Sequence, residues 1–442
     1  MTIRWSGLAG LVVVVLLVAA AAVVPVYVVD PHIPSPPLHN HWGPRAGPGT
    51  VPAVVIALLV VWWGRRIAQH IPWGWLLASA WVVGAAWIAS LTAVDGMVGL
   101  AEQVTRPIQY LPTALRTDDV PGMLREFVSR IPYSARPDNW PIHVAGHPPG
   151  VLLVFIGLAR LGIDTGLSVS LLLIALGATT PVAVLVTARV LGAEAAARSA
   201  APFLVLGPSA VFAGISGDGG LLAPAVAWGL ACLAASAARS RPWPRRLFWG
   251  VLAGLVLGYC LYLSYGFVLV GVLAIAVLVA ARSAYPLLPA LVGAAAVTAV
   301  FWSLDYWWWD SFQVLRERYA EGVARNRPYG YWVWGNLAAF AVSAGPVIGP
   351  ATAVLLRRPR AWLRDHAHRV PVALGVGGWL TVLAADLSGM SKGEVERIWL
   401  PFVPWVLLLT GLLPERWRSP ALGLQAAAAL VVQHLLVQGW MD

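Results

Sequence analysis

The chain has 442 residues, of which 59% are hydrophobic and only 11% are charged, and its mean hydropathy is +0.73. Long apolar runs joined by short polar connectors exclude a soluble domain and predict an all-α polytopic membrane protein. A net charge of +10 would suggest nucleic acid as the partner of a soluble protein. Here the basic residues occupy connectors between apolar runs, so we expect a lipid bilayer as the partner and no nucleic acid.

Several classes of site are excluded by missing motifs. The two cysteines, Cys232 and Cys260, both lie in apolar runs, which favours neither a disulfide framework nor a zinc site. No Walker motif, dinucleotide fingerprint, Gly-x-Ser-x-Gly elbow or His-Glu-x-x-His pair is present. A reaction driven by a bound nucleotide is therefore not indicated.

Thirteen apolar runs are predicted to cross the membrane. The first follows Arg4 and is longer than a signal-peptide core, which favours an anchor that starts in the cytoplasm. An odd number of crossings then predicts a multi-pass plasma-membrane protein with a cytoplasmic N-terminus and an extracytoplasmic C-terminus. The predicted spans are 7–29, 51–63, 74–94, 168–190, 200–215, 220–238, 246–264, 266–281, 287–304, 332–356, 370–387, 398–413 and 420–438.

The segment from Val151 to Ile163 decides this topology. It is shorter than the ~20 apolar residues that a spanning helix needs, Arg160 interrupts it, and Pro148 and Pro149 precede it. We therefore expect a helix that lies at the membrane surface. With this reading, five later arginine-rich connectors fall on the cytoplasmic side, as the positive-inside rule requires; they contain Arg189 and Arg198, Arg239 to Arg246, Arg282, Arg357 to Arg369, and Arg416 and Arg418.

Four polar segments then share the extracytoplasmic face. They are residues 95–150, 216–220, 305–330 and 387–397. The connectors on the other face are short and carry little besides arginine, so an active site is expected to face outward.

Three kinds of residue in these segments could carry chemistry. Asp95 directly follows a predicted span and could act as a general base, or it could simply end the helix. His143 and His147, on either side of Gly146, could bind a phosphate or a sugar hydroxyl, or could be structural. Asp218, in Ser-Gly-Asp-Gly-Gly, could bind a ligand near the membrane surface, or could belong to a tight polar turn.

A cationic cluster on this face breaks the positive-inside trend. Lys392, the only lysine of the chain, and Arg397 precede the run that opens Ile-Trp-Leu-Pro. Such a cluster predicts an anionic partner, which is either the neighbouring glutamates, Glu394 and Glu396, or a bound phosphate.

These residues resemble those of the GT-C superfamily of polyprenyl-phosphate-dependent membrane glycosyltransferases. The resemblance rests on Asp95 after a span, on Gly146-His147-Pro148-Pro149-Gly150 before a short surface helix, and on Asp218 in a second outer loop. The His-Pro-Pro motif is similar to that of the protein mannosyltransferase and aminoarabinose transferase branches, although Gly150 stands where leucine is more usual. The segment 392–397 resembles uncharacterised actinobacterial membrane proteins. The layout implies a two-helix addition over 1–73, a catalytic membrane core over 74–330 with its outer loop at 95–163, and C-terminal spans over 331–442.

The resemblance implies transfer of a sugar from a polyprenyl-phosphate donor to a lipid or glycan acceptor of the cell envelope, with inversion. Asp95 would be the general base, and His143, His147, Asp218, Lys392 and Arg397 would bind substrates. No cofactor is certain, but Asp95 and Asp218 could hold a divalent metal. A transporter or flippase for a lipid-linked or polyanionic substrate is the alternative. Polar residues that gather on the outer face, and not at mid-membrane, argue against it.

Overall fold

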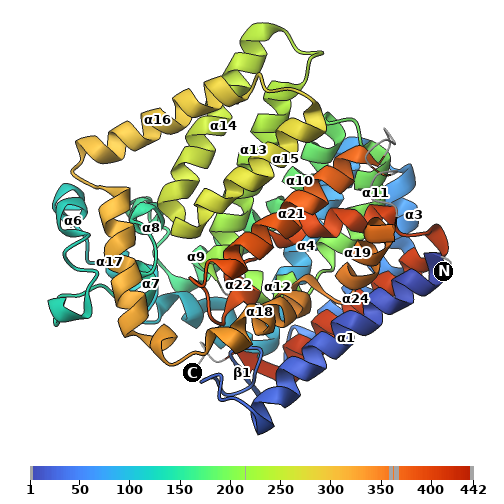
Figure 1. Cartoon of the computed structure of the whole chain (residues 1–442), viewed down its shortest axis with the longest axis horizontal. Helices are drawn as coiled ribbons and strands as arrows, with labels where there is room; N and C mark the ends of the chain where they lie inside the picture. The colour runs from blue at the N-terminus through green and yellow to red at the C-terminus, as the bar shows by residue number, and fades with distance from the viewer. Residues whose placement is uncertain (1–2, 215, 358–361, 363–367, 439–442) are drawn as a thin grey trace.

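The computed structural model describes every residue except 1–2, 215, 358–361, 363–367 and 439–442 (Figure 1). In the described residues the chain is helical apart from two short strands, β1 (Asn40–Trp42) and β2 (Leu436–Gln438). This confirms the all-α class. The helices of the first part of the chain are α1 (Ile3–Tyr27), α2 (Thr50–Leu59), α3 (Arg65–His70), α4 (Trp73–Thr92), α5 (Tyr110–Ala114), α6 (Val120–Glu126), α7 (Ile142–Ala145) and α8 (Gly150–Arg160).

The rest of the chain adds longer helices and a few short ones. The middle part contains α9 (Gly166–Gly177), α10 (Thr179–Val190), α11 (Glu194–Val205), α12 (Ser209–Ala213), α13 (Ala223–Ala237), α14 (Trp243–Leu263), α15 (Val270–Ala281) and α16 (Leu287–Ser303). The last part contains α17 (Trp308–Glu321), α18 (Tyr329–Ala344), α19 (Ile348–Arg357), α21 (Arg369–Leu387), α22 (Val395–Ile398), α23 (Val403–Leu407) and α24 (Glu415–Leu435).

Seven helical segments in the described residues are long and apolar enough to cross a membrane. Two further pairs, α16 with α17 and α18 with α19, pass the same test only as bent units, which raises the number to as many as nine. The chain is therefore a multi-pass membrane protein. The seven segments are Trp5–Tyr27, Thr50–His70, Trp73–Asp95, Gly166–Val190, Asp218–Ala237, Trp243–Leu263 and Arg369–Leu387.

The structure differs from the expected thirteen single-helix crossings where proline and glycine interrupt an apolar run. The run 332–356 bends by 108° between α18 and α19, next to Gly345 and Pro346. The run 200–215 is split into α11 and α12 by Gly207 and Pro208. Proline lacks the backbone N–H and clashes with the preceding turn, so it bends a helix or ends it. The run 398–413 likewise forms α22, α23 and a 3₁₀ segment, not one helix.

The segment after the two prolines is a short helix, as predicted. Helix α8 has 11 residues and therefore rises about 16 Å, which is about half of the hydrocarbon thickness of a bilayer. Gly150 begins this helix directly against α14, where an added Cβ would lie 2.3 Å from the carbonyl oxygen of Tyr262. The hydroxyl of Tyr259 donates a hydrogen bond to the Gly150 carbonyl at 2.9 Å. A leucine at position 150 would not fit this close approach.

Helix α1 packs along α19 (Figure 1). The two helices approach so closely at Gly10 and Gly349 that an added Cβ on either would lie 2.3 Å from the carbonyl oxygen of the other. Strand β1 pairs antiparallel with β2, with Asn40 opposite Gln438. The first 73 residues thus pack on the last part of the chain as well as on α4, and the predicted division into three domains stays a prediction.

Candidate substrate-binding site

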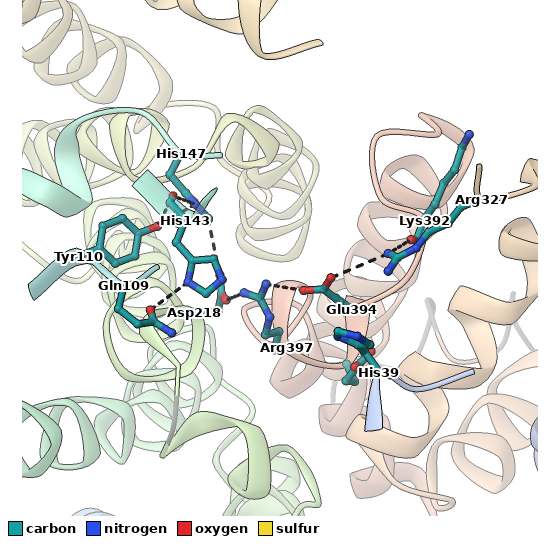
Figure 2. Close-up of polar contacts among 11 residues, drawn as sticks. His39, Gln109, Tyr110, His143, His147, Asp218, Arg327, Lys392, Glu394 and Arg397 are labelled. Carbon is teal, nitrogen blue, oxygen red and sulfur yellow. Dashed lines mark hydrogen bonds and ion pairs between the residues drawn. The ribbon is translucent and has the colours of Figure 1, made fainter. Parts of the chain in front are cut away.

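The four polar segments meet at one end of the helices. Asp218 comes from the second segment, Arg397 from the fourth, and His147 from the first, and all three line one pocket (Figure 2). Arg327, from the third, lies 3.9 Å from Glu394, which pairs with Arg397. The sequence analysis placed these segments on one face of the membrane, and the structure brings these residues of the four segments together. Which side of the membrane they face stays a prediction.

A buried ion pair between Asp218 and Arg397 forms the centre of the site. Nη1 of Arg397 donates to Oδ2 of Asp218 at 2.9 Å, and the two residues are only 5% and 9% exposed. Close packing of the glycines brings Asp218 here, since an added Cβ on Gly219 would lie 2.4 Å from Cα of Ala213, and one on Gly220 would lie 2.6 Å from Cβ of Leu173. The glycines that the sequence analysis noted therefore hold this turn between α12 and α9.

The second arm of Arg397 binds Glu394. Nη2 of Arg397 donates to Oε2 of Glu394 at 2.6 Å. Glu394 and Gly393 both have left-handed backbones, with φ of +61° and +93°, which turns the Glu394 carboxylate toward Arg397. Burial opposes ionisation of Glu394, but the charge and hydrogen bond of Arg397, together with the charges of His39 and Arg327, outweigh burial and hold its pKa at about 2. The two carboxylates likewise raise the pKa of Arg397 against the effect of burial, so a fixed cation lies in the pocket.

His147 faces Asp218 across a gap that a hydroxyl could fill. Its Nε2 lies 3.9 Å from Oδ1 of Asp218. Its Nδ1 lies 3.1 Å from the carbonyl oxygen of His143 and 2.8 Å from the hydroxyl of Tyr110. A carbonyl oxygen can only accept, so Nδ1 carries the hydrogen and Nε2 of the neutral ring keeps a lone pair. Burial lowers the pKa of His147, which keeps the ring neutral.

His143 and Tyr110 support His147 from the side. The Tyr110 hydroxyl donates to the His143 carbonyl at 3.0 Å, and Nδ1 of His143 lies 2.9 Å from Oε1 of Gln109. Burial, followed by the charge of Arg397, lowers the pKa of His143 to about 3. His143 thus lines the pocket as a neutral ring, and Gln109 orients this ring.

An apolar cavity lies behind the polar pocket. The space for the centres of water-sized molecules is about 20 Å³ in the polar pocket and about 60 Å³ in the cavity. Asp218 and Arg397 line the first, whereas Gly219 and Leu400 line the second. The same two chain segments therefore separate a charged space from an apolar one. The cavity is otherwise lined by α4, α9, α10, α11, α12, α13 and α23, including Ile88, Leu204, Ala213, Val403 and Leu407.

The structure separates the two predicted cationic ligands, Lys392 and Arg397. Lys392 does not line the pocket; its Nζ donates to the carbonyl oxygen of Ala324 at 3.1 Å, and it extends away from Asp218 (Figure 2). Its carbonyl oxygen accepts from Nη1 of Arg327 at 2.6 Å, and its N–H donates to the Tyr319 hydroxyl at 2.9 Å.

The structure also places Asp95 outside this pocket. Both of its carboxylate oxygens accept from the guanidinium of Arg45, in the segment between α1 and α2, and Oδ2 also accepts from Nε2 of Gln433 in α24 at 2.8 Å. Asp95 therefore joins three distant parts of the chain. Its role as general base stays a prediction.

Some residues of the pocket were not among the predicted ligands. Gln109 precedes α5 and Tyr110 begins it, in a stretch with no motif, and only the contact with His143 and His147 identifies them. Glu394 was seen as part of a charged cluster, but its spacing did not reveal which cation it binds. In the described residues no three histidine, cysteine, aspartate or glutamate side chains form a group that could hold a metal ion. The possible pairing of Asp95 with Asp218 as metal ligands stays a prediction.

Few known proteins match this chain. No family profile matches the chain, and no curated protein matches it. One similar solved structure is ArnT from Cupriavidus metallidurans in the apo state. The match has a TM-score of 0.46 and 14% sequence identity, and it covers 75% of this chain and 60% of that chain.

Proposed function

We propose that this protein is a membrane glycosyltransferase of the GT-C type. It transfers a sugar, with inversion, from a polyprenyl-phosphate donor to a lipid or glycan acceptor of the cell envelope on the extracytoplasmic face. One observation carries this proposal: a buried cation and a carboxylate line a polar pocket, and the same chain segments line an apolar cavity behind it.

This pairing fits an amphiphilic donor. The isoprene unit next to the phosphate would be stabilised at the apolar cavity because it leaves water there, and the phosphate would lie in the polar pocket beside Arg397. Arg397 presents a planar guanidinium that suits phosphate oxygens, and it lines the pocket that the phosphate would enter. As the glycosidic bond to phosphate breaks, the negative charge that develops on the leaving phosphate would be stabilised by this fixed cation.

The gap between His147 and Asp218 fits the acceptor hydroxyl. An oxygen about 2.8 Å from both Nε2 and Oδ1 would donate its hydrogen to one of these two acceptors, which lie 3.9 Å apart. In this conformation we assign proton acceptance to the His147–Asp218 pair. Asp95 can be the base only where Arg45 has released it, because both of its oxygens are now bonded to that guanidinium.

The deciding experiment is transfer of radiolabelled sugar from polyprenyl-phosphate donors by the purified protein in lipid. We expect turnover for the natural chain and its loss in Asp218→Asn, which keeps the shape of the side chain. An exposed carboxylate of the first polar segment, altered in Asp118→Asn, is the matched control and should keep turnover. No turnover with any donor, together with movement of a lipid-linked substrate across proteoliposomes, would replace this proposal with the transporter alternative.

A further inference from the structure

A second, open site lies beside the candidate substrate pocket. A groove runs between α17 and the turn at 389–392, with about 550 Å³ of space for the centres of water-sized molecules. It shares no lining residue with the polar pocket or with the apolar cavity behind it. The lining residues are Gln313, Arg316, Glu317, Tyr319, Ala320, Ala324, Arg325, Gly389, Met390 and Lys392.

The groove has a positive charge. Arg316, Arg325 and Lys392 line it against a single carboxylate, Glu317. Arg316 and Arg325 are exposed to solvent. Lys392 uses one hydrogen to bind the carbonyl oxygen of Ala324, and an ammonium group has three. This charge lies at the end of the molecule where the sequence analysis expects few cations.

The groove adjoins the pocket through a short chain of contacts. Lys392 forms part of the groove, and its carbonyl oxygen accepts from Arg327. Arg327 lies 3.9 Å from Oε1 of Glu394, and Glu394 pairs with Arg397 in the pocket (Figure 2). A ligand that fills the groove would therefore extend toward the reacting centre.

We propose that this groove binds an anionic group of a glycan acceptor, either a phosphate or a carboxylate. The inference rests on the proposed function and adds the chemical class of the acceptor to it. The donor phosphate has its own cation in Arg397, next to the apolar cavity, whereas this groove is open and polar and suits a water-borne substrate. The guanidinium of an arginine can bind a phosphate or a carboxylate with two parallel hydrogen bonds. Gln313, Glu317 and Tyr319 offer hydrogen-bond partners for sugar hydroxyls.

The test measures binding to the full chain in phosphatidylcholine nanodiscs. The probes are three oligosaccharides of equal length: a phosphorylated mannose oligomer, a galacturonic acid oligomer and a neutral maltose oligomer. We expect a charged probe to bind and the neutral one not to bind. Whether the phosphate or the carboxylate probe binds more tightly identifies the source of the anion.

Variants locate the binding. Arg316→Gln combined with Arg325→Gln should weaken binding of the charged probe by about tenfold, and Glu317→Gln should strengthen it. Two exposed arginines outside the groove, altered together in Arg116→Gln and Arg125→Gln, are the matched control. Equal binding of the neutral probe, absence of any binding, or equal affinity of the groove and control variants would each overturn the inference.

The transfer assay keeps this inference distinct from the proposed function. Intact sugar transfer with no anionic binding overturns only the groove. Anionic binding that the groove variants weaken, in a protein that transfers no sugar, overturns the proposed function and leaves the groove as a glycan-binding site.

Discussion

Two arginines, Arg397 in the site and Arg198 in a connector, both bind a carboxylate but have different surroundings. In the arginine-rich connectors, guanidinium groups donate to backbone carbonyl oxygens as well as to Glu194, which binds Arg189 and Arg198. Arg198 binds those of Ala68 and Ile71 at 2.8 and 2.9 Å, and Arg418 binds those of Leu413 and Gly411 at 2.9 and 3.1 Å. At the other end, Arg397 and Arg45 bind carboxylates.

The difference indicates which arginines can take part in function. A carbonyl oxygen at a helix end that loses its arginine is left without a partner, and that costs free energy, so these contacts fasten helices to one another. Arg397 lines the polar pocket, so an anion that enters the pocket can reach this cation, whereas Arg198 fastens α11 to the end of α3.

The largest effect is expected for Arg397→Gln. Loss of the buried cation should reduce sugar transfer by about a hundredfold or more, because the leaving phosphate loses its preorganised partner. Arg198→Gln, in the connectors, should instead lower the melting temperature and keep turnover per folded molecule. Turnover rates and melting curves of both variants test the contrast, and an active Arg397→Gln protein would remove Arg397 from the mechanism.

The stability of the site end is expected to depend on pH through Glu396. It is fully buried; its Oε1 accepts from the His39 N–H at 3.3 Å, and its Oε2 has no hydrogen-bond partner among the described residues. Burial raises its pKa to about 7, with Glu394 adding to the shift. Because the folded pKa lies above the unfolded value of 4.5, the stabilisation is complete below pH 4.5 and is lost as the pH rises toward 7.

Glu396→Gln should remove this loss, since glutamine stays neutral. Above pH 7 the variant should have a higher melting temperature than the natural chain, and its free energy of unfolding should be higher by up to about 3 kcal/mol. Both differences should shrink toward pH 4.5. Melting curves across this range are the measurement. A constant difference at all pH values would show that Glu396 does not titrate in the folded protein.

Substitutions at Asp95 distinguish a structural role of this residue from a role as catalytic base. If the Asp95–Arg45 contact is structural, Asp95→Asn and Arg45→Gln should each destabilise the protein by about 1–3 kcal/mol. Turnover of the folded fraction should then stay within a few-fold of normal. Thermal unfolding and sugar transfer, measured on the same preparations, distinguish the two roles. Abolished transfer in Asp95→Asn at an unchanged melting temperature would establish Asp95 as the base.

The smallest effect is expected for Lys392→Ala on the affinity for the polyprenyl-phosphate donor. Lys392 lies outside the pocket of Arg397, so affinity for the polyprenyl-phosphate donor should change by less than about twofold. Affinity for the charged oligosaccharide should fall more. A donor affinity that drops as far as in Arg397→Gln would put the two cations back into one site, as the sequence pattern suggested.

Much of this organisation could be predicted from the sequence because it depends on long-range composition. Apolar runs indicated the membrane helices, and the number of residues after Pro149 indicated that α8 is too short to cross. Charge placement brought Asp218, His147 and Arg397 to the same end. Each of these features depends on hydrophobicity, length or charge, which a sequence shows directly.

The remaining features depend on local geometry that a sequence does not show. Left-handed backbones at Gly393 and Glu394 turn Lys392 and Arg397 in different directions, although they are five positions apart. The partner of Asp95 comes from a loop 50 residues earlier in the chain, and no spacing rule connects the two. Proline breaks such as the one near Pro346 could be suspected, but whether a helix bends or ends there depends on its neighbours.

The pairing of β1 with β2 has a consequence for biosynthesis. His434 binds Thr50, 384 residues earlier in the chain, and Gln433 completes the contacts of Asp95. During synthesis at the membrane, the segment before α2 therefore waits with an unpaired strand and an incomplete ion-pair cluster until α24 is inserted. The contacts that α24 and β2 make with this early segment are therefore the last to form during synthesis.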